Sequence, residues 1–570
     1  MKKLIRLAAQ ALVEIKLNIL LVTSQVRGVD GAGGLGDVPV GLANELNTGE
    51  GVEVGLAMPG YASISGHGLD DRFGEQNLLM RGLQVPFGDR AVSVDVYQIV
   101  VPQTAGSPRI VCYLFRCPEV FDQVDPQTGK VNKDTPDKAI LLSRAVLEFI
   151  KAFKAVRFDL IHCNDWQTGL IPVYVKTLYK EDAAIKGIAT VYTTHNAGTG
   201  FQGSYFNAPH WLWLAGLDKS GVFERGQTRS LEHFGNFNFT KGGVAFADLG
   251  NTVSFTYLKE LHMVAFSGGL DGVFLGRGSD FDGIVNGIDY PEWDPANDPA
   301  LLPVRFSAKD SVAAVQQAKR RLRSVLREWT VPEKYPTKGT KPFSALRDDT
   351  IILATVGRID FQKIPILFRA ISGIVSDRDV QLCILGDAHP NDSLGQKYAE
   401  KIEEIAKWSG GKVLFFRGFD LHLSHLLYGC SQGFIIGSVF EPCGLTQLVA
   451  MRYGSVPVAA RKTGGIADTI IDEADPNSGN RANGFLFKEE VPYGKMIDET
   501  VSLDGLLAAA KASDELLEAV RRALRIYREN PERWASLMKN GMARDSSWKA
   551  PSLQYLHLYQ EAIRRTRLVP

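Results

Sequence analysis

The chain has 570 residues, of which 45% are hydrophobic and 22% charged, and this composition excludes a mainly disordered, collagenous or coiled-coil protein. At roughly 150 residues per domain, the length indicates three or four domains, but two α/β domains of about 250 residues fit equally well. The 64 basic and 64 acidic residues cancel. No global field therefore attracts nucleic acid, and any anionic ligand must be held by local charge.

The six cysteines are scattered, and none belongs to a C-x-x-C pair. We therefore predict neither a disulfide framework nor a structural zinc site. Arg6, Glu14 and Lys16 interrupt the apolar stretch near the start of the chain, which makes it a poor signal peptide. No stretch approaches 18 consecutive apolar residues, so no membrane span is expected.

The first half of the chain alternates strand and helix patterns. Ile15–Ser24 predicts a strand, a glycine-rich turn follows, and residues 36–46 predict a helix. Val52–Met58 predicts the next strand, which stops at Pro59-Gly60. This order is typical of the start of a Rossmann-like parallel unit. Further strands are expected at 93–101, 110–115, 160–162, 189–194 and 249–253, with helices at 139–154 and 169–178.

A second unit of the same kind begins at Ile351. Its predicted strands are ILATVGR, VQLCILG, 413–416 and 433–436, and its predicted helices start at Ile364 and span 394–408, 423–429 and 445–453. A helix before it carries a basic run that we interpret as a solvated face: Lys319, Arg320, Arg321, Arg323 and Arg327. Two polar helices, at about 514–527 and 551–566, are expected at the end.

Gly33 and Gly34 lie in a glycine-rich loop, GAGGLGD, between the first strand and the first helix. Such a loop lets backbone N–H groups approach a phosphate or a sugar closely, although a plain tight turn fits the pattern as well. The loop has neither a P-loop lysine nor G-x-G-x-x-G spacing. A P-loop nucleotidase and a dinucleotide enzyme are therefore poorly supported.

Two cations, Arg358 and Lys363, follow the strand ILATVGR five residues apart. At a strand-to-helix loop they could clamp a diphosphate, with arginine bonding oxygens in pairs and lysine acting as a point charge. Two ordinary surface cations are the alternative.

Polar residues also follow three other predicted strands. Glu441 lies in FEPCGLTQL, just before a helix start, where it faces a phosphate pocket or caps the helix. Asp165 follows the strand LIHCN and His195 follows VYTT. A lone histidine at such a position is more often structural, but several polar residues converging on one cleft favour a site.

The stretches GAGGLGDVPVGLANEL, HCNDWQTGLIPVYVK, NFTKGGVAFADLGNTVS, GRIDFQK and FEPCGLTQLVAMRYGSVPVAARKTGGIADTI occur in this order over nearly the whole chain. In this the chain resembles the bacterial glycogen synthase and plant starch synthase family, glycosyltransferase family 5. The resemblance implies the α/β fold called GT-B, two Rossmann-like doubly wound domains facing each other across a deep cleft. The implied domains are 1–300 on the acceptor side, 301–545 on the donor side, and a helix at 546–570 that crosses back.

The resemblance also implies the reaction. Glucose would pass from ADP-glucose to the non-reducing 4-hydroxyl of an α-1,4-glucan, either glycogen or a maltooligosaccharide, with retention and without a metal or other cofactor. Neither nucleic acid nor a membrane is expected as a partner. The first residues show no transit segment rich in serine and arginine, so a cytoplasmic location is expected.

Site roles follow from the same resemblance, position by position. Arg358 and Lys363 would grip the diphosphate, and Glu441 would face the glucosyl unit. Asp165 and His195 would line the glucose pocket from the N-terminal domain. The remaining donor contacts would be Gly33, Gly34, Asn286, Cys443, Gly444, Leu445 and Thr446, with Tyr428 beside the nucleobase.

The chain departs from the family pattern at several of these loops. Gly31 replaces the usual lysine of K-x-G-G-L, Gln25 replaces an acidic residue, and Val439 replaces an arginine. Ile364 stands where a turn glycine is usual, and two extra residues fall within 197–201. Losing one charged phosphate contact typically costs about 1.5–3 kcal/mol, or ~10- to 100-fold in rate.

Three functions therefore remain open from the sequence. The first is an active ADP-glucose-dependent α-1,4-glucan synthase, which the intact C-terminal motifs favour. The second is a weakly active or non-catalytic paralogue that binds glucan or nucleotide. The third is a variant that uses UDP-glucose or a short oligosaccharide acceptor.

Overall fold

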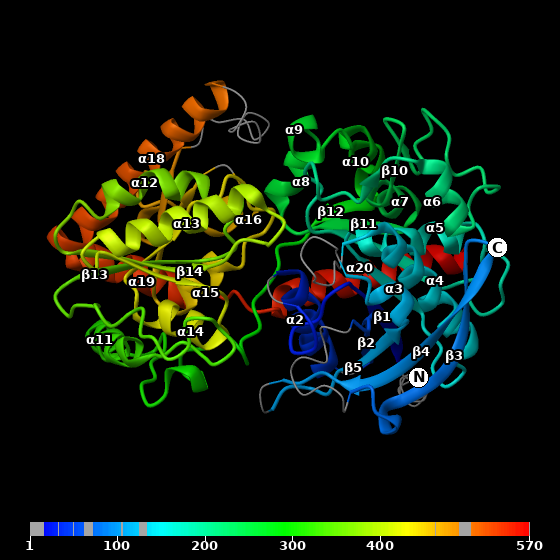
Figure 1. Ribbon diagram of the computed structural model, residues 1–570, viewed down its shortest axis with the longest axis horizontal. Helices are drawn as coiled ribbons and strands as arrows, with labels where there is room; N and C mark the ends of the chain where they lie inside the picture. Colours follow the sequence, from blue (N-terminus) through cyan, green and yellow to red (C-terminus); the bar gives the residue numbers. More distant parts are fainter. Residues whose placement is uncertain are drawn as a thin grey trace, which may run out of the picture. The chain divides into compact units, whose positions relative to one another are not determined.

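The structure is a computed structural model, and it describes residues 16–31, 34–49, 51–61, 72–103, 106–124, 134–461, 463–488 and 503–568. The chain divides into two compact units (Figure 1). Unit 1 contains the residues up to Val253, Leu258–Asp289 and the residues from Trp548, and unit 2 contains Ser254–Tyr257 and Tyr290–Ser547. The sequence suggested 300 and 546 as boundaries. The N-terminal residues 1–15 and Gly33 lie outside the described residues.

Unit 1 is built on a nine-stranded sheet of order β12-β11-β7-β6-β1-β2-β5-β4-β3. The strands are β1 (Leu17–Val22), β2 (Val52–Pro59), β3 (Leu78–Phe87), β4 (Arg90–Val100), β5 (Val111–Arg116), β6 (Leu160–Asn164), β7 (Ala189–Thr194), β11 (Leu249–Thr252) and β12 (Phe281–Gly283). The strands from β12 to β5 pair in parallel, and β4 pairs antiparallel to both β3 and β5. Because β1 lies between β2 and β6, the strand order reverses there, and ligands of open α/β sheets bind at such a point.

Several helices accompany this sheet, and the first turn of one of them, Phe255–Tyr257, belongs to unit 2. They are α2 (Gly34–Thr48), α3 (Pro118–Phe121), α4 (Pro136–Ala152), α5 (Leu170–Lys176), α7 (Phe239–Phe246), α8 (Phe255–Leu261), α9 (Val264–Ser267), α10 (Asp271–Arg277) and α20 (Lys549–Leu568). A small three-stranded sheet, β8 (Ser204–Tyr205), β10 (Asn236–Asn238) and β9 (Glu232–His233), lies next to α6 (Ala208–Ala215). Sequence patterns did not predict this sheet, because its strands are only two or three residues long.

The last helix, α20, packs against β7 and α2 of unit 1. Its Tyr559 hydroxyl donates to His162 Nδ1 at 2.7 Å, and Asn251 Nδ2 donates to the Tyr555 hydroxyl at 3.0 Å. Burial lowers the pKa of His162 to about 3, so its ring is neutral and can accept this bond. Polar groups buried under the helix are therefore satisfied only when α20 is in place.

Unit 2 contains a six-stranded sheet of order β15-β14-β13-β16-β17-β18, in which every pair is parallel. The strands are β13 (Ile351–Val356), β14 (Val380–Gly386), β15 (Val413–Arg417), β16 (Gly433–Ile436), β17 (Val456–Ala460) and β18 (Phe485–Phe487). This is a doubly wound Rossmann order, and it reverses between β13 and β16. Buried apolar runs such as VQLCILG, of which every residue is buried, form these strands because both faces of the sheet are covered.

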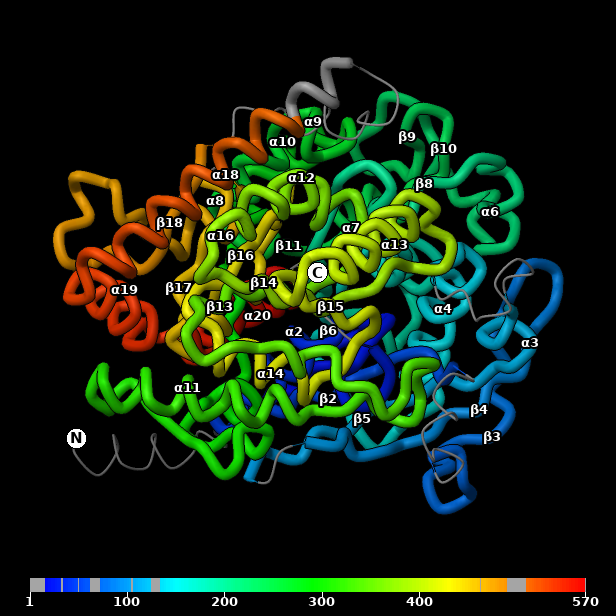
Figure 2. Tube along the Cα trace, turned by 60° about the vertical axis from the view of Figure 1, so that its left-hand side comes forward, coloured from blue at the N-terminus to red at the C-terminus, as the bar shows by residue number. Residues whose placement is uncertain are grey.

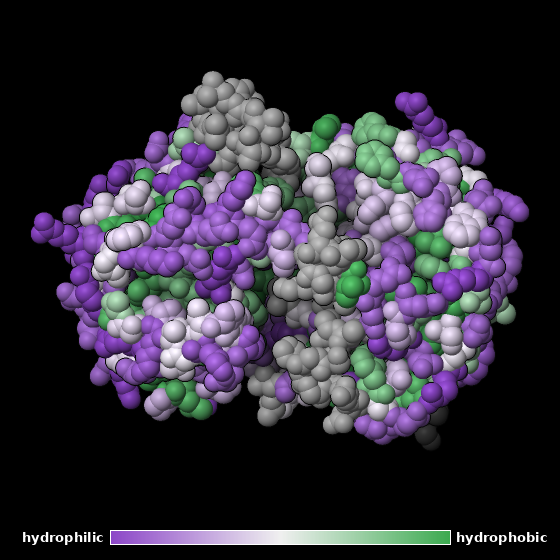
Figure 3. Space-filling model, viewed as in Figure 1, coloured by the Kyte–Doolittle hydropathy of each residue, from purple (hydrophilic) through white to green (hydrophobic). Residues whose placement is uncertain are grey.

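The helices of unit 2 are α11 (Val312–Glu328), α12 (Pro365–Ile374), α13 (Ser393–Trp408), α14 (Leu421–Cys430), α15 (Thr446–Arg452), α16 (Gly464–Thr469), α18 (Leu503–Glu529) and α19 (Pro531–Ala543). Figures 1 and 2 show α18 alongside α12, against which it packs. The outer face of α13 is hydrophilic (Figure 3).

The described part of the chain ends in three helices, α18, α19 and α20, not in the two predicted. The additional helix is α19, which Asn530 caps and whose first residue is Pro531.

The basic helix α11 is only partly solvated. Lys319 and Arg323 are buried, whereas Arg320 and Arg321 are exposed. Lys319 Nζ donates to the carbonyl oxygens of Ser431 at 2.9 Å and Gly429 at 3.3 Å, near the end of α14. Burial lowers the pKa of this lysine to about 7. The solvated-face interpretation is wrong for these two side chains, because one face of the amphipathic helix packs on α14.

Candidate active site

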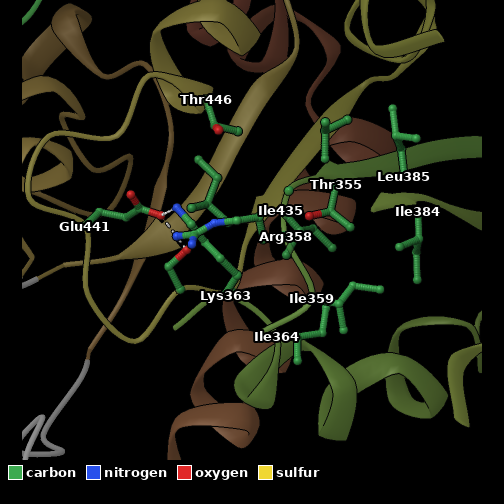
Figure 4. A pocket seen from close by; sticks show the side chains of 15 residues that line it. Thr355, Arg358, Ile359, Lys363, Ile364, Ile384, Leu385, Ile435, Glu441 and Thr446 are labelled. Carbon is green, nitrogen blue, oxygen red and sulfur yellow. Dashed lines mark hydrogen bonds and ion pairs between the residues drawn. The ribbon is translucent and has the colours of Figure 1, made fainter. Parts of the chain in front are cut away.

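A small pocket lies at the carboxyl ends of β13 and β16, the point where the strand order of unit 2 reverses. Its lining residues include Gly357, Arg358, Lys363, Ser438, Glu441 and Thr446. Figure 4 shows Arg358 and Lys363 directed toward the carboxylate of Glu441. The structure therefore brings together the two predicted cations and the predicted acid, which the sequence separates by about 80 positions.

One oxygen of the Glu441 carboxylate is held by two side chains. Lys363 Nζ forms a close ion pair with Glu441 Oε1, and the Ser438 hydroxyl donates to the same oxygen at 2.6 Å. Only 6% of the Glu441 side chain is exposed, against 24% for Lys363. An ion pair this well buried is less screened by salt than a surface pair. The Glu441 carboxylate thus pairs with the lysine that is predicted to hold a diphosphate.

Arg358 is the more accessible cation, with 62% of its side chain exposed. Its guanidinium lies 3.4 Å from the Asp360 carboxylate and donates to Gln362 Oε1 at 3.2 Å. Asp360 Oδ1 in turn accepts the backbone N–H groups of Gln362 and Lys363. The Arg358–Lys363 turn is therefore pre-organised by its own acidic residue.

The loop that carries Glu441 packs directly on the backbone at Gly464 and Gly465. A Cβ at Gly464 would lie 2.0 Å from Glu441 O, and a Cβ at Gly465 would lie 2.1 Å from Cys443 O. The Glu441 N–H donates to Thr463 Oγ1 at 2.5 Å. Two glycines are thus required for the close approach that positions this acid.

The other predicted donor contacts in unit 2 follow Glu441 in the chain. Cys443 is buried, Gly444 has a left-handed φ of 67°, and α15 begins at Thr446. Thr446 lines the pocket with Glu441, whereas Cys443, Gly444 and Leu445 do not line it.

Tyr428 lies apart from this pocket. Its ring is 5% exposed and stacks on Phe434 with centroids 4.5 Å apart. The structure therefore offers no ring face of Tyr428 to a nucleobase. Phe419, which follows β15 at the carboxyl edge of the same sheet, is an aromatic residue that is 45% exposed.

In unit 1, Asp165 follows β6 beside the point where that sheet reverses. Its backbone has φ 59° and ψ 179°, a conformation found almost only in glycine and typical of functional sites. Its carboxylate accepts the His195 N–H at 3.0 Å. Burial raises the pKa of Asp165 to about 7, although the N–H bonds of His195 and Asn196 oppose this shift.

His195 follows β7, the strand next to β6. Its Nε2 donates to Asn164 Oδ1 at 2.9 Å. Burial lowers the pKa of His195 to about 4, so the ring is neutral at pH 7. Asp165 and His195, each predicted at a strand end, are thus connected by a hydrogen bond.

Asn286 lies beyond the end of β12, and its buried Oδ1 accepts no hydrogen bond from any residue in the described ranges. Gly34 is the first residue of α2. The roles of Asn286 and Gly34 as donor contacts stay predictions.

Gly31 is fixed as glycine by its backbone. Its φ of 129° is unfavourable for other residues, and a Cβ there would lie 2.7 Å from Gln25 Cβ. The loop also closes on itself, since Val26 and Asp30 exchange backbone hydrogen bonds of 3.0 and 2.9 Å. The departure from lysine is therefore built into the loop conformation of this chain.

Substituting Gly31 with lysine is expected to lower the stability of unit 1 by about 1–3 kcal/mol, because the left-handed backbone and the contact with Gln25 both disfavour a side chain. Thermal unfolding of Gly31→Lys and Gly31→Ala measures this loss. Gly187→Ala is the control, since Gly187 has a φ of 88° with no neighbour within 4 Å of its Cβ. Unchanged stability together with faster turnover in Gly31→Lys would contradict the expectation.

Two of the other departures, Val439 and Ile364, are accommodated without strain. Val439 is buried, and its N–H donates to Gln362 O at 2.8 Å. Ile364 has a φ of −106° and is buried at the start of α12, so no glycine is needed there. An arginine at 439 would have to enter the core around this valine.

Comparison with known proteins agrees with this arrangement. Residues 18–275 match the starch synthase catalytic domain, and residues 338–493 match the glycosyl transferases group 1 domain. A glycogen synthase of Pseudothermotoga lettingae is 32% identical over 96% of this chain and 99% of its own length. A glycogen synthase of Syntrophotalea carbinolica is also 32% identical, over 96% of this chain and 99% of its length.

Among solved structures, the catalytic domain of starch synthase IV from Arabidopsis thaliana, bound to ADP and acarbose, superimposes with a TM-score of 0.77. It is 26% identical and covers 96% of this chain and 100% of its own.

Two Rossmann-like units with these matches define a glycosyltransferase of the GT-B fold. The chain belongs to the family of bacterial glycogen synthases and plant starch synthases. The family, the fold class and the assignment as an enzyme of the glycogen or starch synthase type, all predicted from the sequence, are thereby confirmed.

Within the ranges that the structure describes, no helix is long and apolar enough to cross a membrane. The same ranges contain no group of three or more His, Cys, Asp or Glu side chains placed to hold a metal ion.

Proposed function

We propose that this enzyme is a retaining glucosyltransferase that extends an α-1,4-glucan at its non-reducing end from ADP-glucose. The observation that carries the proposal is the pocket in which Lys363, Arg358 and Ser438 surround Glu441 at the reversal point of the donor-side sheet. The similar starch synthase IV was solved with ADP, which supports an adenine nucleotide as the donor. The proposal includes no metal or other cofactor.

In the proposed reaction, the bond from the anomeric carbon to the diphosphate oxygen breaks, and a bond to the acceptor 4-hydroxyl oxygen forms. The proton of that hydroxyl leaves with the diphosphate. Negative charge therefore grows on ADP, where Arg358 and Lys363 stabilise it more in the transition state than in the ground state.

Donor binding would exchange the partners of Lys363. The diphosphate carries more charge than the Glu441 carboxylate, so it would displace that carboxylate from Lys363 Nζ. Glu441 would remain anchored by the Ser438 hydroxyl, 2.6 Å from its Oε1. The released carboxylate would then be available to hydroxyls of the glucosyl unit.

Asp165 and the neutral His195 are proposed to contact the glucosyl hydroxyls, as the family resemblance implies. The strained backbone of Asp165 supports this role, since such conformations persist where function requires them. Phe419 replaces Tyr428 as the residue proposed to stack on the adenine ring, because an exposed aromatic face is needed.

The experiment that tests the proposal is incorporation of labelled glucose from ADP-glucose into glycogen by the wild type and by Glu441→Ala. We expect Glu441→Ala to reduce the rate by about 100-fold or more, as expected for a group that acts at the reacting centre. Glu400→Ala, at an exposed acid on α13, is the matched control. Equal rates for Glu441→Ala and wild type would refute the role of Glu441.

One observation favours a variant specificity: the loop at Gln25 and Gly31 differs from the family pattern and has a closed conformation of its own. A panel of ADP-, UDP- and GDP-glucose, each with glycogen and with maltooligosaccharides, separates the donors and acceptors. Faster turnover with UDP-glucose, or with short acceptors only, would replace the primary proposal with this variant. Absence of turnover with every pair would indicate a non-catalytic binding protein.

A further inference from the structure

The turn between β9 and β10 contains a phenylalanine, Phe234, at a position whose backbone conformation is unfavourable for that residue type. His233 pairs with Asn236, so Phe234 and Gly235 form a two-residue hairpin loop, and their φ angles are 50° and 85°. A loop with positive φ at both positions strongly favours Asn-Gly, because asparagine tolerates the left-handed region. A bulky phenylalanine there is a backbone outlier. Positions that break a local rule are expected to be functional sites.

The ring of Phe234 gains no burial in return for this strain. It is 81% exposed, and its ring centroid lies 4.5 Å from that of His233. Gly269, with a φ of 87°, leaves room for the ring, since a Cβ at Gly269 would lie 2.7 Å from it. The phenyl group is therefore presented to solvent by its neighbours rather than packed into the core.

Hydrogen bonds join this hairpin to the loop that follows His195. Gln202 Nε2 donates to Ala197 O at 2.7 Å and to Ser267 O at 2.5 Å. Asn238, at the end of β10, donates to Gln202 Oε1 at 2.9 Å. The hairpin is thus continuous with the segment that leaves the Asp165–His195 pair.

A second exposed ring, Phe206, lies at the same end of the small sheet. Tyr205 pairs with Phe237 and His233 pairs with Asn236, so Phe206, 84% exposed, follows β8 on the far side of β10 from Phe234. Figure 2 shows β8, β9 and β10 together beside α6.

The exposed rings continue along α6. Trp211 Nε1 donates to Phe206 O at 2.7 Å, and the His210 ring lies 4.6 Å from that of Trp211 and 5.7 Å from that of Trp213. Trp213 is 39% exposed and is fixed by a bond from its Nε1 to Asp89 Oδ1 at 2.8 Å. Rings held in this way lose little entropy when a ligand binds.

We propose that Phe234, Phe206 and Trp213, the aromatic track, bind a segment of α-1,4-glucan that extends from the acceptor end. Glucosyl rings present apolar C–H faces that stack on aromatic side chains, and exposed apolar patches of this kind mark binding surfaces. Asp89, which accepts the Trp213 bond, and Asn207, which follows Phe206 in the chain, add polar groups that suit sugar hydroxyls. The proposal rests on the proposed function for its ligand, and it adds a binding surface outside the reacting centre.

The test uses Phe234→Asn and Phe206→Ala in the full-length protein, with glycogen retention in native gels and the KM for glycogen as readouts. Phe234→Asn removes the ring but suits the turn, so we expect thermal stability equal to or above that of wild type. We expect each variant to raise the KM for glycogen and to weaken retention about 5-fold, which corresponds to about 1 kcal/mol. The KM for ADP-glucose and the kcat at saturating glycogen should stay within about twofold.

Trp408→Ala is the matched control, because Trp408 is 88% exposed on α13 of unit 2. Unchanged retention and KM in both variants, with an active wild type, would overturn the track. Loss of stability in Phe234→Asn in step with its binding loss would also overturn it, since the ring would then be structural. Retention of glycogen does not require catalysis, so an inactive wild type whose retention still depends on Phe234 would refute only the proposed reaction. A change in oligomeric state in place of a change in retention would assign the surface to a second copy of the chain.

Discussion

Replacement of Lys363 with alanine is expected to lower kcat by about 100- to 1000-fold, because in the proposed reaction the lysine stabilises charge that grows on the leaving diphosphate. The same change leaves the Glu441 carboxylate, 6% exposed, without its cation. We therefore also expect a loss of stability of about 3 kcal/mol, as for a broken buried pair. Rapid-quench assays with labelled ADP-glucose and chemical denaturation measure the two effects.

A double substitution separates these two roles of Lys363. In Lys363→Ala with Glu441→Gln, no unpaired carboxylate remains, so most of the lost stability should return while the activity stays low. Lys401→Ala is the control, because Lys401 is a surface lysine paired with Glu404 on α13. A Lys363→Ala enzyme with a wild-type kcat and a raised KM alone would show that the lysine only binds the donor.

Asp165→Asn is expected to stabilise unit 1 at alkaline pH. The pKa of Asp165 is raised from 3.8 to about 7 in the folded protein, chiefly by burial. The folded state therefore binds a proton more tightly than the unfolded state, and stability declines as pH rises from about 4 to about 7. The asparagine variant lacks this penalty but keeps an oxygen that accepts the His195 N–H.

At pH 8 we expect the variant to exceed the wild type by about 2–4 kcal/mol, since a tenfold difference in proton affinity between the folded and unfolded states corresponds to about 1.4 kcal/mol. The difference should vanish below about pH 4, where Asp165 is protonated in both states. Denaturation midpoints measured across this pH range, with Asp218→Asn as the control at an exposed acid, test the expectation. A stability difference that does not depend on pH would contradict it.

Much of the fold could be predicted because the parallel strands are buried on both faces and appear as short apolar runs. β7 and β14 have the predicted bounds. The antiparallel strand β3 was missed, since it is half exposed and contains Gly82 and Pro86. The short strands of the small sheet carry too few residues for any periodicity.

The site was predicted where strand ends and motifs coincide, as at Lys363 and Glu441. It could not be predicted where backbone conformation decides the chemistry. The left-handed Gly31, the strained Asp165 and the left-handed Phe234 are visible only as φ angles. Tyr428 was misplaced because the sequence does not tell which face of α14 packs on β16.

The position of α20 has a consequence for biosynthesis. His162 and Asn251 bond to tyrosines of a helix that begins at residue 549, so these partners are synthesised after all of unit 2. A nascent chain that has completed unit 2 still has an unfinished unit 1, with a polar patch of its sheet uncovered. Synthesis of α20, rather than synthesis of the first half of the chain, is therefore the step that completes unit 1. Truncations before residue 549 should accordingly be retained by chaperones or aggregate.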